Sequence, residues 1–394
     1  MRASWPMVPL GEVLAAREET PDPVAIASGE IPIVAKIGFN DGLVQLRVNG
    51  DTRTKMILVR PGDLLVSSIN AAKGAIAIYG QENARSAAAT IHYSAYVPHK
   101  TRVDVRYLWW LLRSDTFRRI LLDHLPGGIK TELKAARLLR VPISLPPLRE
   151  QRRLVAKLDH LAAKIEEVRG LQRRATEEAE ALLVSASRQA FSLHGSGGSQ
   201  DIPLESCCEA IIDYRGRTPP IADAGIPHIT SANIRNGRIN WNTPKFITSE
   251  VYDRYMTRGL PRPGDVIFTM EAPLGEVAVV PDGRKFSLAQ RTLLLRPDSA
   301  LLSGDYLAKA LTSPDVRSAI HAQTTVTTVR GIASKRLRKI PIPVPSFASQ
   351  RHIVAYLDGL QAKVDALKGL QAQTAAELDA LLPSILDKAF KGEL

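Results

Sequence analysis

The sequence is poor in cysteine and in aromatic residues, and it has no long apolar run. Its 394 residues include two cysteines, and 5% of them are aromatic. Cys207 and Cys208 are adjacent, so they do not form an ordinary structural disulfide, and no zinc-ligand pattern surrounds them. No apolar stretch reaches the roughly 18 residues of a membrane span, and residues 1–10 lack the apolar segment of a signal peptide. We therefore expect a reduced, cytoplasmic protein without structural zinc.

Motifs for cofactor chemistry are missing as well. The phosphate-binding pattern GxxxxGK[ST] is absent, and the string GGIKT at 127–131 lacks its spacing. No strand–GxGxxG–helix unit is visible, and the eight histidines lie outside any HExxH or triad-like context. Asp63 and Asp265 each follow Pro-Gly, a context that suits a turn better than catalysis. We expect no catalytic, cofactor-binding or metal-binding residue, which favours a binding protein.

The sequence does contain an excess of positive charge. Its formal net charge is +12 at pH 7, and the pI is about 9.7. A basic chain of this size often binds a polyanion such as nucleic acid. The alternative is a basic surface without a partner, and charge alone does not choose between the two.

The most informative feature is an internal repeat. Residues 145–191 recur at 344–390, always 199 positions later, and 20 of the 47 residues are identical. Upstream of the repeat, Tyr107 and Ser114 match Tyr306 and Ser313 at the same offset. A chain built twice on one plan is expected to do one job twice. The predicted layout is a first domain at 1–147, a long helix at 148–192, a Gly/Ser linker at 193–201, a second domain at 202–345 and a second long helix at 346–391.

Both copies of the repeat have the apolar spacing of a coiled coil. The predicted seam consists of Leu154, Leu158, Leu161, Ile165, Val168, Ala175, Ala179, Leu182 and Ala186 in the first copy, and of Ile353, Leu357, Leu360, Val364, Leu367, Thr374, Leu378, Leu381 and Ile385 in the second. Gln172 and Gln371 take equivalent central positions, and we expect Pro383 to kink or end the second helix. Antiparallel packing of these helices would relate the two halves by a pseudo-twofold axis.

Each globular half contains short apolar segments separated by Pro and Gly, which are typical of strands. One helix is expected near the end of each half, at 104–122 and at 303–321. The predicted fold class is α+β, with two similar mixed α/β domains joined by two long antiparallel coiled-coil helices.

At the two repeats the sequence resembles a known family. The strings VPISLPPLREQRRLVAKLD (141–159) and IPIPVPSFASQRHIVAYLD (340–358) resemble the proline-then-helix junctions in specificity (S) subunits of Type I restriction-modification systems. The matching residues are Pro146, Pro147, Leu148, Glu150, Gln151, Val155, Leu158 and Asp159, and Pro345, Gln350, Ile353, Val354, Leu357 and Asp358. The second copy departs at Ser346, Ala348 and Ser349, so contacts at its helix start are expected to differ.

The resemblance implies a fold and a function. Such subunits have two target recognition domains, separated by a central and a C-terminal conserved helical region. They bind an asymmetric, two-part double-stranded DNA sequence and recruit methyltransferase (modification) subunits, here expected to be two, and restriction/translocase subunits. They perform no catalysis, so no cofactor is expected in this chain, while the partner subunits are expected to use S-adenosylmethionine, ATP and Mg²⁺.

If the chain binds DNA, Lys and Arg should contact phosphates, and polar loop residues should contact base edges. The candidates for base contact are Lys36, Asn40, Asn70, Lys73, Lys130 and Thr131 in the first domain, and Arg215, Arg217, Thr218, Ser231, Asn233, Glu271, Thr325 and Thr327 in the second. Glu271 is of interest because a carboxylate can accept a hydrogen bond from cytosine N4. The candidates for phosphate or partner contact are Lys134, Arg137, Arg140, Arg152, Arg153, Lys157, Lys335, Arg336, Arg338 and Lys339.

Two other classes of function stay open on the sequence alone. A coiled-coil scaffold that binds only protein partners would have the same helices but would not retard duplex DNA selectively. An enzyme with an unrecognised site would methylate or cleave a substrate as the isolated chain. The DNA target itself, its spacer and the stoichiometry of a complex do not follow from the sequence.

Overall fold

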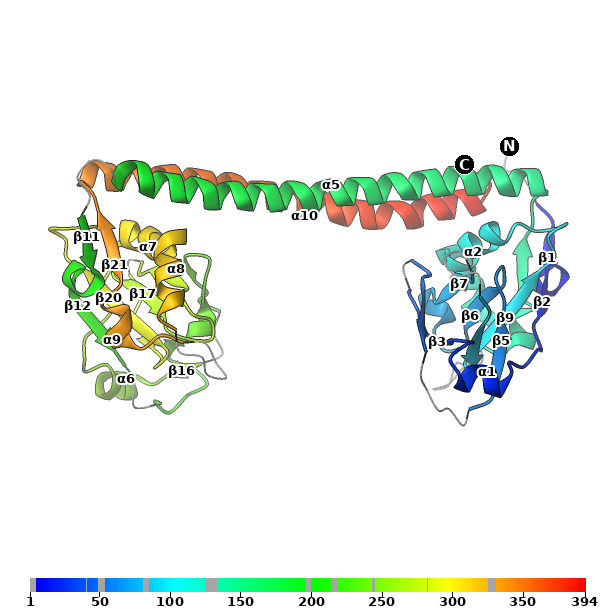
Figure 1. Ribbon diagram of the computed structural model, residues 1–394, viewed down its shortest axis with the longest axis horizontal. Helices are drawn as coiled ribbons and strands as arrows, with labels where there is room; N and C mark the ends of the chain where they lie inside the picture. Colours follow the sequence, from blue (N-terminus) through cyan, green and yellow to red (C-terminus); the bar gives the residue numbers. More distant parts are fainter. Residues whose placement is uncertain are drawn as a thin grey trace. The chain divides into compact units, whose positions relative to one another are not determined.

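The structure, a computed structural model, describes residues 5–39, 41–48, 54–80, 85–124, 133–195, 200–214, 218–242, 245–281, 283–324 and 331–394. The chain divides into two compact units (Figure 1). Unit 1 comprises Met1–Gln172 and Gln371–Leu394, and unit 2 comprises Arg173–Leu370. Each unit therefore holds one globular domain together with a part of each long helix.

The domain of unit 1 has two four-stranded sheets. Their strand orders are β2-β9-β6-β7 and β4-β3-β8-β5. The strands are β2 (Leu14–Ala16), β9 (Tyr93–Pro98), β6 (Leu64–Ser67) and β7 (Ile76–Ile78), and β4 (Val44–Arg47), β3 (Ile33–Ile37), β8 (Ala87–Thr90) and β5 (Met56–Val59). Val34, Leu65 and Ala89, from strands of both sheets, share one buried cluster. Because strand β6 is covered on both faces, all four of its residues are buried.

Unit 2 repeats the first of these sheets and varies the second. The sheet β12-β20-β17-β18 is the counterpart of β2-β9-β6-β7 in strand order and in antiparallel pairing. Its strands are β12 (Cys208–Asp213), β20 (Thr292–Pro297), β17 (Val266–Thr269) and β18 (Val277–Val279). The second sheet is β16 (Phe246–Ile247), β13 (Ile226–Ile229) and β19 (Ser287–Leu288), and β14 (Ile234–Arg235) pairs with β15 (Arg238–Ile239). Strands β16, β13 and β19 keep the order and the pairing of β4, β3 and β8, so the two domains share one whole sheet and three strands of the other.

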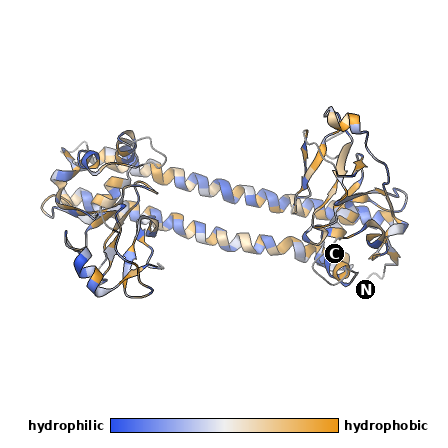
Figure 2. Ribbon diagram, turned by 90° about the horizontal axis from the view of Figure 1, so that it is seen from below, coloured by the Kyte–Doolittle hydropathy of each residue, from blue (hydrophilic) through white to orange (hydrophobic). Residues whose placement is uncertain are grey.

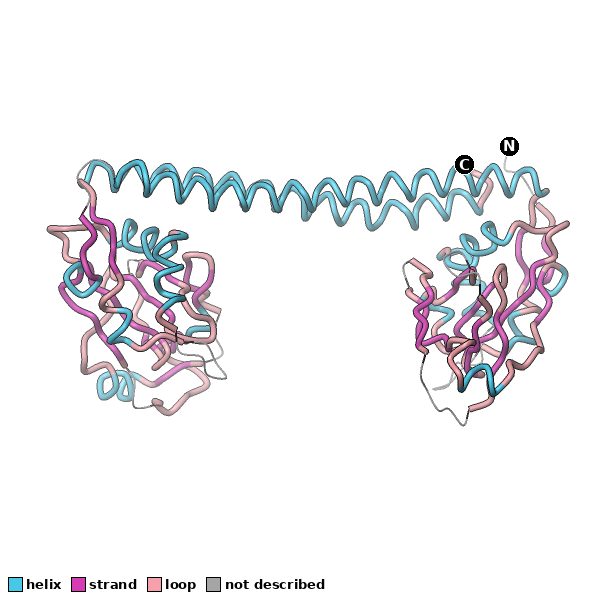
Figure 3. The backbone as a smooth tube through the Cα atoms, in the orientation of Figure 1, coloured by secondary structure: helices cyan, strands magenta, loops and turns pink. Residues whose placement is uncertain are grey.

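Short elements complete both domains (Figure 3). In unit 1, β1 (Met7–Pro9) pairs with β10 (Pro142–Ser144), and in unit 2, β11 (Gln200–Pro203) pairs with β21 (Pro341–Val344). These pairs tie the start of each domain to the strand that leads into a long helix. The remaining short helices are α1 (Pro23–Ala27), α4 (Ala135–Leu138), α6 (Ser249–Tyr255) and α9 (Ser334–Leu337), with 3₁₀ turns at Leu10–Glu12, Ala71–Lys73, Leu204–Cys207 and Ser231–Asn233.

The helices predicted over 104–122 and 303–321 are each divided in two. The structure has α2 (Val105–Arg113), α3 (Asp115–His124), α7 (Gly304–Thr312) and α8 (Pro314–Ala322). The breaks fall at Ser114 and Ser313, whose backbones are extended with ψ of 153° and 148°. Each serine hydroxyl donates to the carbonyl three residues back, at 2.6 Å and 2.7 Å, and so satisfies the end of the preceding helix. Periodicity alone did not reveal the breaks, because the apolar spacing continues across them.

The long helices α5 (Leu148–Gly195) and α10 (Phe347–Phe390) lie antiparallel to each other within each unit. In unit 1, Arg153 contacts the Leu394 carbonyl oxygen at 2.8 Å, and Gln371 donates to the Gln172 carbonyl oxygen at 3.0 Å. Residues later in α5 thus contact residues earlier in α10, as antiparallel helices do. The predicted antiparallel pairing is confirmed, and α5 extends three residues beyond its predicted end at 192.

Unit 2 shows the same pairing from other parts of the two helices. Lys368 forms an ion pair with Glu180 at 2.6 Å, and Phe191 shares a buried cluster with Ile353 and Leu357. The two helices have apolar residues interspersed with hydrophilic ones along their length (Figure 2). None of the helices among the described residues is long and apolar enough to cross a membrane.

Two predictions about these helices are wrong in detail. Leu182 and Leu381, equivalent positions assigned to the seam, are 63% and 44% exposed, while their neighbours Leu183 and Leu382 are partly buried. Val168 is exposed as well, because a regular helix drifts relative to a strict heptad repeat. Of the two effects predicted for Pro383, a kink or an end of the helix, the end is wrong, because α10 continues to Phe390. Leu386, Ala389 and Phe390 are buried in the domain core, and this burial offsets the backbone hydrogen bond that Pro383 cannot make.

Candidate functional site

A buried glutamine fixes the start of each long helix to its domain. Gln151 donates to the carbonyl oxygens of Pro146 and Arg102, at 2.8 Å and 3.0 Å, and accepts from the Asp104 amide at 2.8 Å. Gln350 makes the same three contacts in unit 2, with Pro345 and Leu301 at 3.0 Å and 2.8 Å and with the Ser303 amide at 3.2 Å. Because every polar atom of these buried amides is paired, the orientation of each helix start is set by its own domain.

A second repeated contact closes each domain against the helix that returns to it. Phe390 of α10 packs edge-on against Tyr107 with ring centroids 5.6 Å apart, and Phe191 of α5 packs against Tyr306 at 5.8 Å. The two tyrosine hydroxyls donate to the carbonyl oxygens of Ser144 and Pro343 at 2.9 Å and 2.7 Å. Burial raises the pKa of both tyrosines well above the usual range, so they stay neutral.

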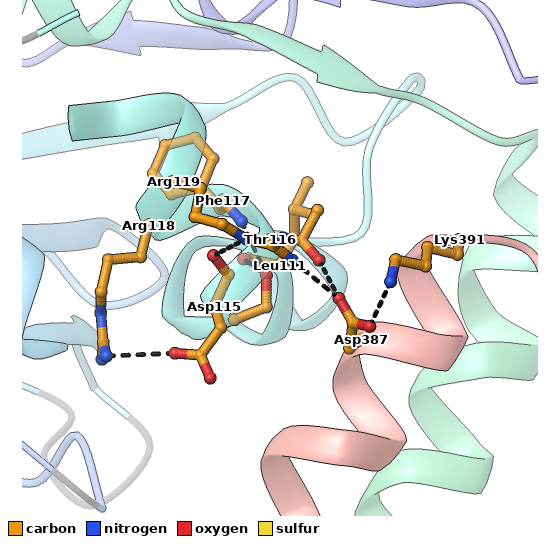
Figure 4. A network of polar contacts seen from close by, with 9 residues as sticks. Leu111, Asp115, Thr116, Phe117, Arg118, Arg119, Asp387 and Lys391 are labelled. Carbon is orange, nitrogen blue, oxygen red and sulfur yellow. Dashed lines mark hydrogen bonds and ion pairs between the residues drawn. The ribbon is translucent and has the colours of Figure 1, made fainter. Parts of the chain in front are cut away.

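Near these aromatic contacts, each unit has an ion pair between a long helix and its domain, and the positions of the acid and the base are exchanged between the two units. In unit 1, Asp387 of α10 accepts from Thr116, Arg119 and Lys391 at 2.7, 3.1 and 2.5 Å (Figure 4). At the equivalent helix position in unit 2, Arg188 of α5 lies 3.6 Å from Asp315 of its domain. The acid is therefore on the helix in unit 1 and on the domain in unit 2.

The two Pro-Gly-Asp turns are structural. Asp63 accepts from Arg17 at 2.6 Å and 2.7 Å and from the Arg60 amide at 2.8 Å. Asp265 accepts from Arg296 at 3.0 Å and 2.9 Å and from the Arg262 amide at 2.8 Å. Both carboxylates are buried, and the predicted role in a turn is confirmed. The partner arginines come from different strand ends, which sequence alignment of the two turns does not reveal.

A pair of turns follows the central strands β6 and β17, and we call residues 68–70 the β6 turn and residues 270–272 the β17 turn. The same two backbone hydrogen bonds hold both of them. The Ser68 amide donates to His92 at 2.8 Å, and its carbonyl oxygen accepts from Leu133 at 2.9 Å. The Met270 amide donates to Arg291 at 3.0 Å, and its carbonyl oxygen accepts from Ile332 at 3.1 Å. The two turns thus share these two backbone hydrogen bonds, which we call their backbone frame. They differ at its end, where Ala272 has a φ of 48° and a cis bond to Pro273, and the matching Asn70 has a φ of −117°.

The side chains at these turns differ. Ile69 of the β6 turn is 55% exposed. Glu271 takes the matching place in the β17 turn, and its Oε1 lies 3.2 Å from Nε of Arg291, with side chains 39% and 51% exposed. The Ser231 hydroxyl donates to the Ala272 carbonyl oxygen at 3.2 Å and supports this turn from the other side. Ile69 and Arg291 were not among the predicted site residues; aligning the two halves at their central strands matches Ile69 with Glu271, while the match of His92 with Arg291 follows from the strand register.

The structure places the predicted base-contacting residues in three groups. Lys36 on β3, Lys73 and Thr218 are exposed, and Asn70 and Glu271 are half-buried at the β6 and β17 turns. Seven lie outside the described residues: Asn40, Lys130, Thr131, Arg215, Arg217, Thr325 and Thr327. The other two, Ser231 and Asn233, are buried.

The assignment of Ser231 and Asn233 to base contact needs correction. Asn233 accepts from the Thr230 amide and hydroxyl at 3.0 Å and 2.8 Å and donates to the Asn240 carbonyl oxygen at 3.1 Å. It therefore caps the 3₁₀ turn Ser231–Asn233. The Ser231 hydroxyl donates to the Ala272 carbonyl oxygen. Both residues are therefore buried supports of the surface turns and not base-contacting groups.

Basic residues collect where each domain meets its helix. Those exposed are Lys134, Arg137, Arg140, Arg152, Arg153 and Lys157 in unit 1, and Lys335, Arg336 and Lys339 in unit 2. Lys335, Arg336 and Lys339 line an open hollow of about 500 Å³ beside α8. Arg153 pairs with Glu150 at 2.6 Å, and the half-buried Arg338 donates to the Ile211 carbonyl oxygen at 3.3 Å. Arg137 and Arg140 match Arg336 and Lys339 in the repeat, so both domains keep a basic pair here.

Comparison with known proteins gives a consistent result. The family model described as "Type I restriction modification DNA specificity domain" matches residues 215–375. The specificity subunit of the Type I restriction enzyme EcoKI of Escherichia coli (strain K12) is 24% identical over 325 residues, 77% of this chain and 66% of that protein. The EcoBI specificity subunit of Escherichia coli is 25% identical over 170 residues, 43% of this chain and 36% of that protein. These alignments span at most about two thirds of the curated relatives' own length.

Two solved structures are similar over nearly their whole length. One, from a study of complex assembly and conformational transition of the Type I R-M system, has a TM-score of 0.78 at 27% identity and covers 100% of both chains. The other, the HsdS subunit from Thermoanaerobacter tengcongensis, has a TM-score of 0.64 at 27% identity and covers 100% of this chain and 98% of that one.

Proposed function

Since this chain belongs to the family of Type I restriction-modification specificity subunits, we propose that it recognises an asymmetric, two-part DNA site. Each domain binds one part of the site. One observation carries this proposal. The two domains have the same four-stranded sheet and the same buried glutamine at the helix start, but they carry different side chains at equivalent turns. One scaffold with two sets of exposed groups suits two unequal half-sites.

The exposed cations supply the affinity for DNA in this proposal. Arg137 and Arg140 in unit 1, and Arg336 and Lys339 in unit 2, are candidates for phosphate contact because they are exposed and repeated. Lys335, Arg336 and Lys339 line one open hollow, so their positive charges would attract a phosphate group to the same place. Contacts of this kind release counterions, so binding should weaken steeply with salt.

The long helices recruit the partners. Leu182 and Leu381 leave apolar surface exposed at equivalent positions, one in unit 2 and one in unit 1. Leu171 and Leu370 form a second equivalent exposed pair. Two matching surfaces favour two copies of the methyltransferase subunit, with restriction/translocase subunits joining the same complex. The alternative of a scaffold that binds proteins alone has no observation in its favour.

Catalysis in this proposal belongs to the partners. Among the described residues, no group of three His, Cys, Asp or Glu side chains is arranged to hold a metal ion. We propose that the methyltransferase and restriction subunits use S-adenosylmethionine, ATP and Mg²⁺, and that this chain supplies recognition and position.

The test is to co-produce the chain with the methyltransferase subunit encoded beside it, in a host without other DNA methylation, and to sequence the methylome. We expect one two-part asymmetric motif. The purified complex should retard a duplex with that motif more strongly than a scrambled duplex. The double variant Arg137→Gln, Arg336→Gln should bind both the duplex with the motif and the scrambled duplex more weakly. The magnitude of the slope of log K against log[salt] should fall by about two, because two phosphate contacts are lost. A wild-type complex that assembles and methylates no defined motif would contradict the proposal.

A further inference from the structure

We propose that the β6 turn and the β17 turn each enter the major groove and select different base pairs. Glu271 and Arg291 of unit 2 select a C·G pair, and Ile69 of unit 1 selects a thymine. This inference rests on the proposed function and names the bases that the two turns recognise.

The backbone frame of the two turns is the first step of the argument. Each turn directly follows the buried central strand of its sheet, and each is held by two backbone hydrogen bonds of 2.8–3.1 Å to equivalent neighbours. Glu271 also forms an isolated β-bridge with Gly331. A Cβ added at Gly331 would lie 3.3 Å from Cβ of Glu271, so the two chains approach closely there. Side chains carried by such a frame have a fixed direction, as specific base contacts require.

The chemistry of the β17 turn is the second step. The ion pair uses Oε1 of Glu271 and Nε of Arg291. Among the described residues, no hydrogen-bond partner occupies Oε2 of Glu271 or the two terminal nitrogens of Arg291. A carboxylate accepts from cytosine N4, and the terminal nitrogens of arginine donate to guanine O6 and N7. Both partners of one C·G pair are thus matched by adjacent groups of opposite charge.

The two turns keep the same two backbone hydrogen bonds although Ile69 occupies the place of Glu271 and His92 the place of Arg291. These two bonds therefore do not require a Glu–Arg ion pair. The side chains at the matching places can differ while the bonds stay the same.

The β6 turn presents an apolar side chain where the β17 turn presents charge. Ile69 is 55% exposed at a turn whose neighbours Asn70 and Lys73 are polar. The C5 methyl group of thymine is the one apolar contact that a base edge offers in the major groove. An exposed branched aliphatic side chain on a fixed frame matches that group, and it has no favourable contact with cytosine N4.

The experiment compares Glu271→Gln with the wild type in the methyltransferase complex. Glutamine keeps the size of the side chain but also donates, so it accepts adenine as well as cytosine at the contacted position. We expect one C·G position in one half of the methylated motif to become degenerate. Affinity for a duplex with the wild-type motif should fall about ten-fold. Glu250→Gln is the matched control, because Glu250 forms an exposed ion pair with Arg254 at 3.0 Å in the same domain.

A transplant supplies the second arm. Ile69→Glu with His92→Arg places the unit 2 pair on the β6 turn, and we expect the other half of the motif to require C·G in place of T·A. If both variant complexes methylate the wild-type motif, the inference is wrong while the proposed function stands. If the wild-type complex itself has no motif, the proposed function fails first. If the Glu271→Gln complex does not assemble, the transplant tests the inference alone: a change from T·A to C·G supports it, and an unchanged motif contradicts it.

Discussion

At the residue scale, a buried glutamine joins the start of each long helix to its domain. Gln151 and Gln350 each pair all their polar atoms with backbone groups between domain and helix. The repeat identifies both glutamines from the sequence alone, since each lies five residues after a proline. Their partners, such as the carbonyl oxygens of Arg102 and Leu301, become apparent only once the domain has folded. A repeated residue can thus be recognised as important before its role is known.

His228 gives a prediction about pH. Its ring nitrogen Nδ1 lies 2.9 Å from the Ser287 hydroxyl in the core of unit 2. Burial, with a smaller contribution from Lys245, lowers the pKa of His228 from 6.5 to about 4. Between those values the unfolded chain binds the proton and the folded one does not, so stability falls as pH drops below 6.5. At pH 5 the loss from this group is about 2 kcal/mol.

The measurement is thermal unfolding of the full chain between pH 7 and pH 5, for the wild type and for His228→Asn. Asparagine keeps a hydrogen bond to Ser287 but does not titrate, so its unfolding midpoint should depend less on pH. The exposed His160 on α5 is the control, and His160→Asn should leave the wild-type slope unchanged. Parallel pH curves for the wild type and His228→Asn would show that His228 is not responsible.

At the element scale, the ends of the long helices carry charges that fit only their own domain. Asp387→Arg would place a cation beside Arg119 and Lys391 in unit 1, and Arg188→Asp would place an anion beside Asp315 in unit 2. Since these pairs are partly exposed, each reversal should cost about 1 kcal/mol and lower the unfolding midpoint by a few degrees. Arg119→Asp in the same chain should recover part of the loss of Asp387→Arg. The effect should shrink in high salt, and an equal loss at all salt concentrations would exclude an electrostatic cause.

The exposed leucines of the helices give a prediction about assembly. Leu182→Asp with Leu381→Asp should weaken copurification with the methyltransferase subunit, because apolar surface would be lost at both equivalent positions. Neither side chain is buried in its unit, so the unfolding midpoint of the isolated chain should change little. Leu122→Asp, on an exposed position of α3, is the control for adding a charge elsewhere. Undiminished copurification of the double variant would remove these leucines from the partner surface.

At the scale of the whole molecule, two domains built on one plan should be interchangeable modules. We expect that replacing residues 1–147 by the corresponding domain of a relative changes one half of the methylated motif and leaves the other half unchanged. The replacement should retain a glutamine at the position of Gln151 and its backbone partners, because this contact joins domain and helix. Methylome sequencing of the hybrid complex decides the matter, and a change in both halves of the motif would contradict modular recognition.

The repeat and the spacing of apolar residues determined the architecture from the sequence alone. Equivalent patterns 199 residues apart require equivalent structures, and helical periodicity over tens of residues reports burial on one face. The broken helices at Ser114 and Ser313 escaped this reasoning, because a serine hydroxyl that ends a helix leaves the apolar pattern intact.

Only the tertiary structure decided which side chains are available for recognition. Ser231 and Asn233 have the composition of a binding loop, yet hydrogen bonds within the domain consume their polar atoms. Ile69 and Arg291 were not among the residues predicted to bind DNA, but Ile69 lies on the β6 turn and the Arg291 carbonyl oxygen accepts from the β17 turn. Exposure depends on contacts between residues far apart in the chain, such as Ser231 with Ala272. The sequence therefore determined the plan of each half, while the folded contacts determined what each half can recognise.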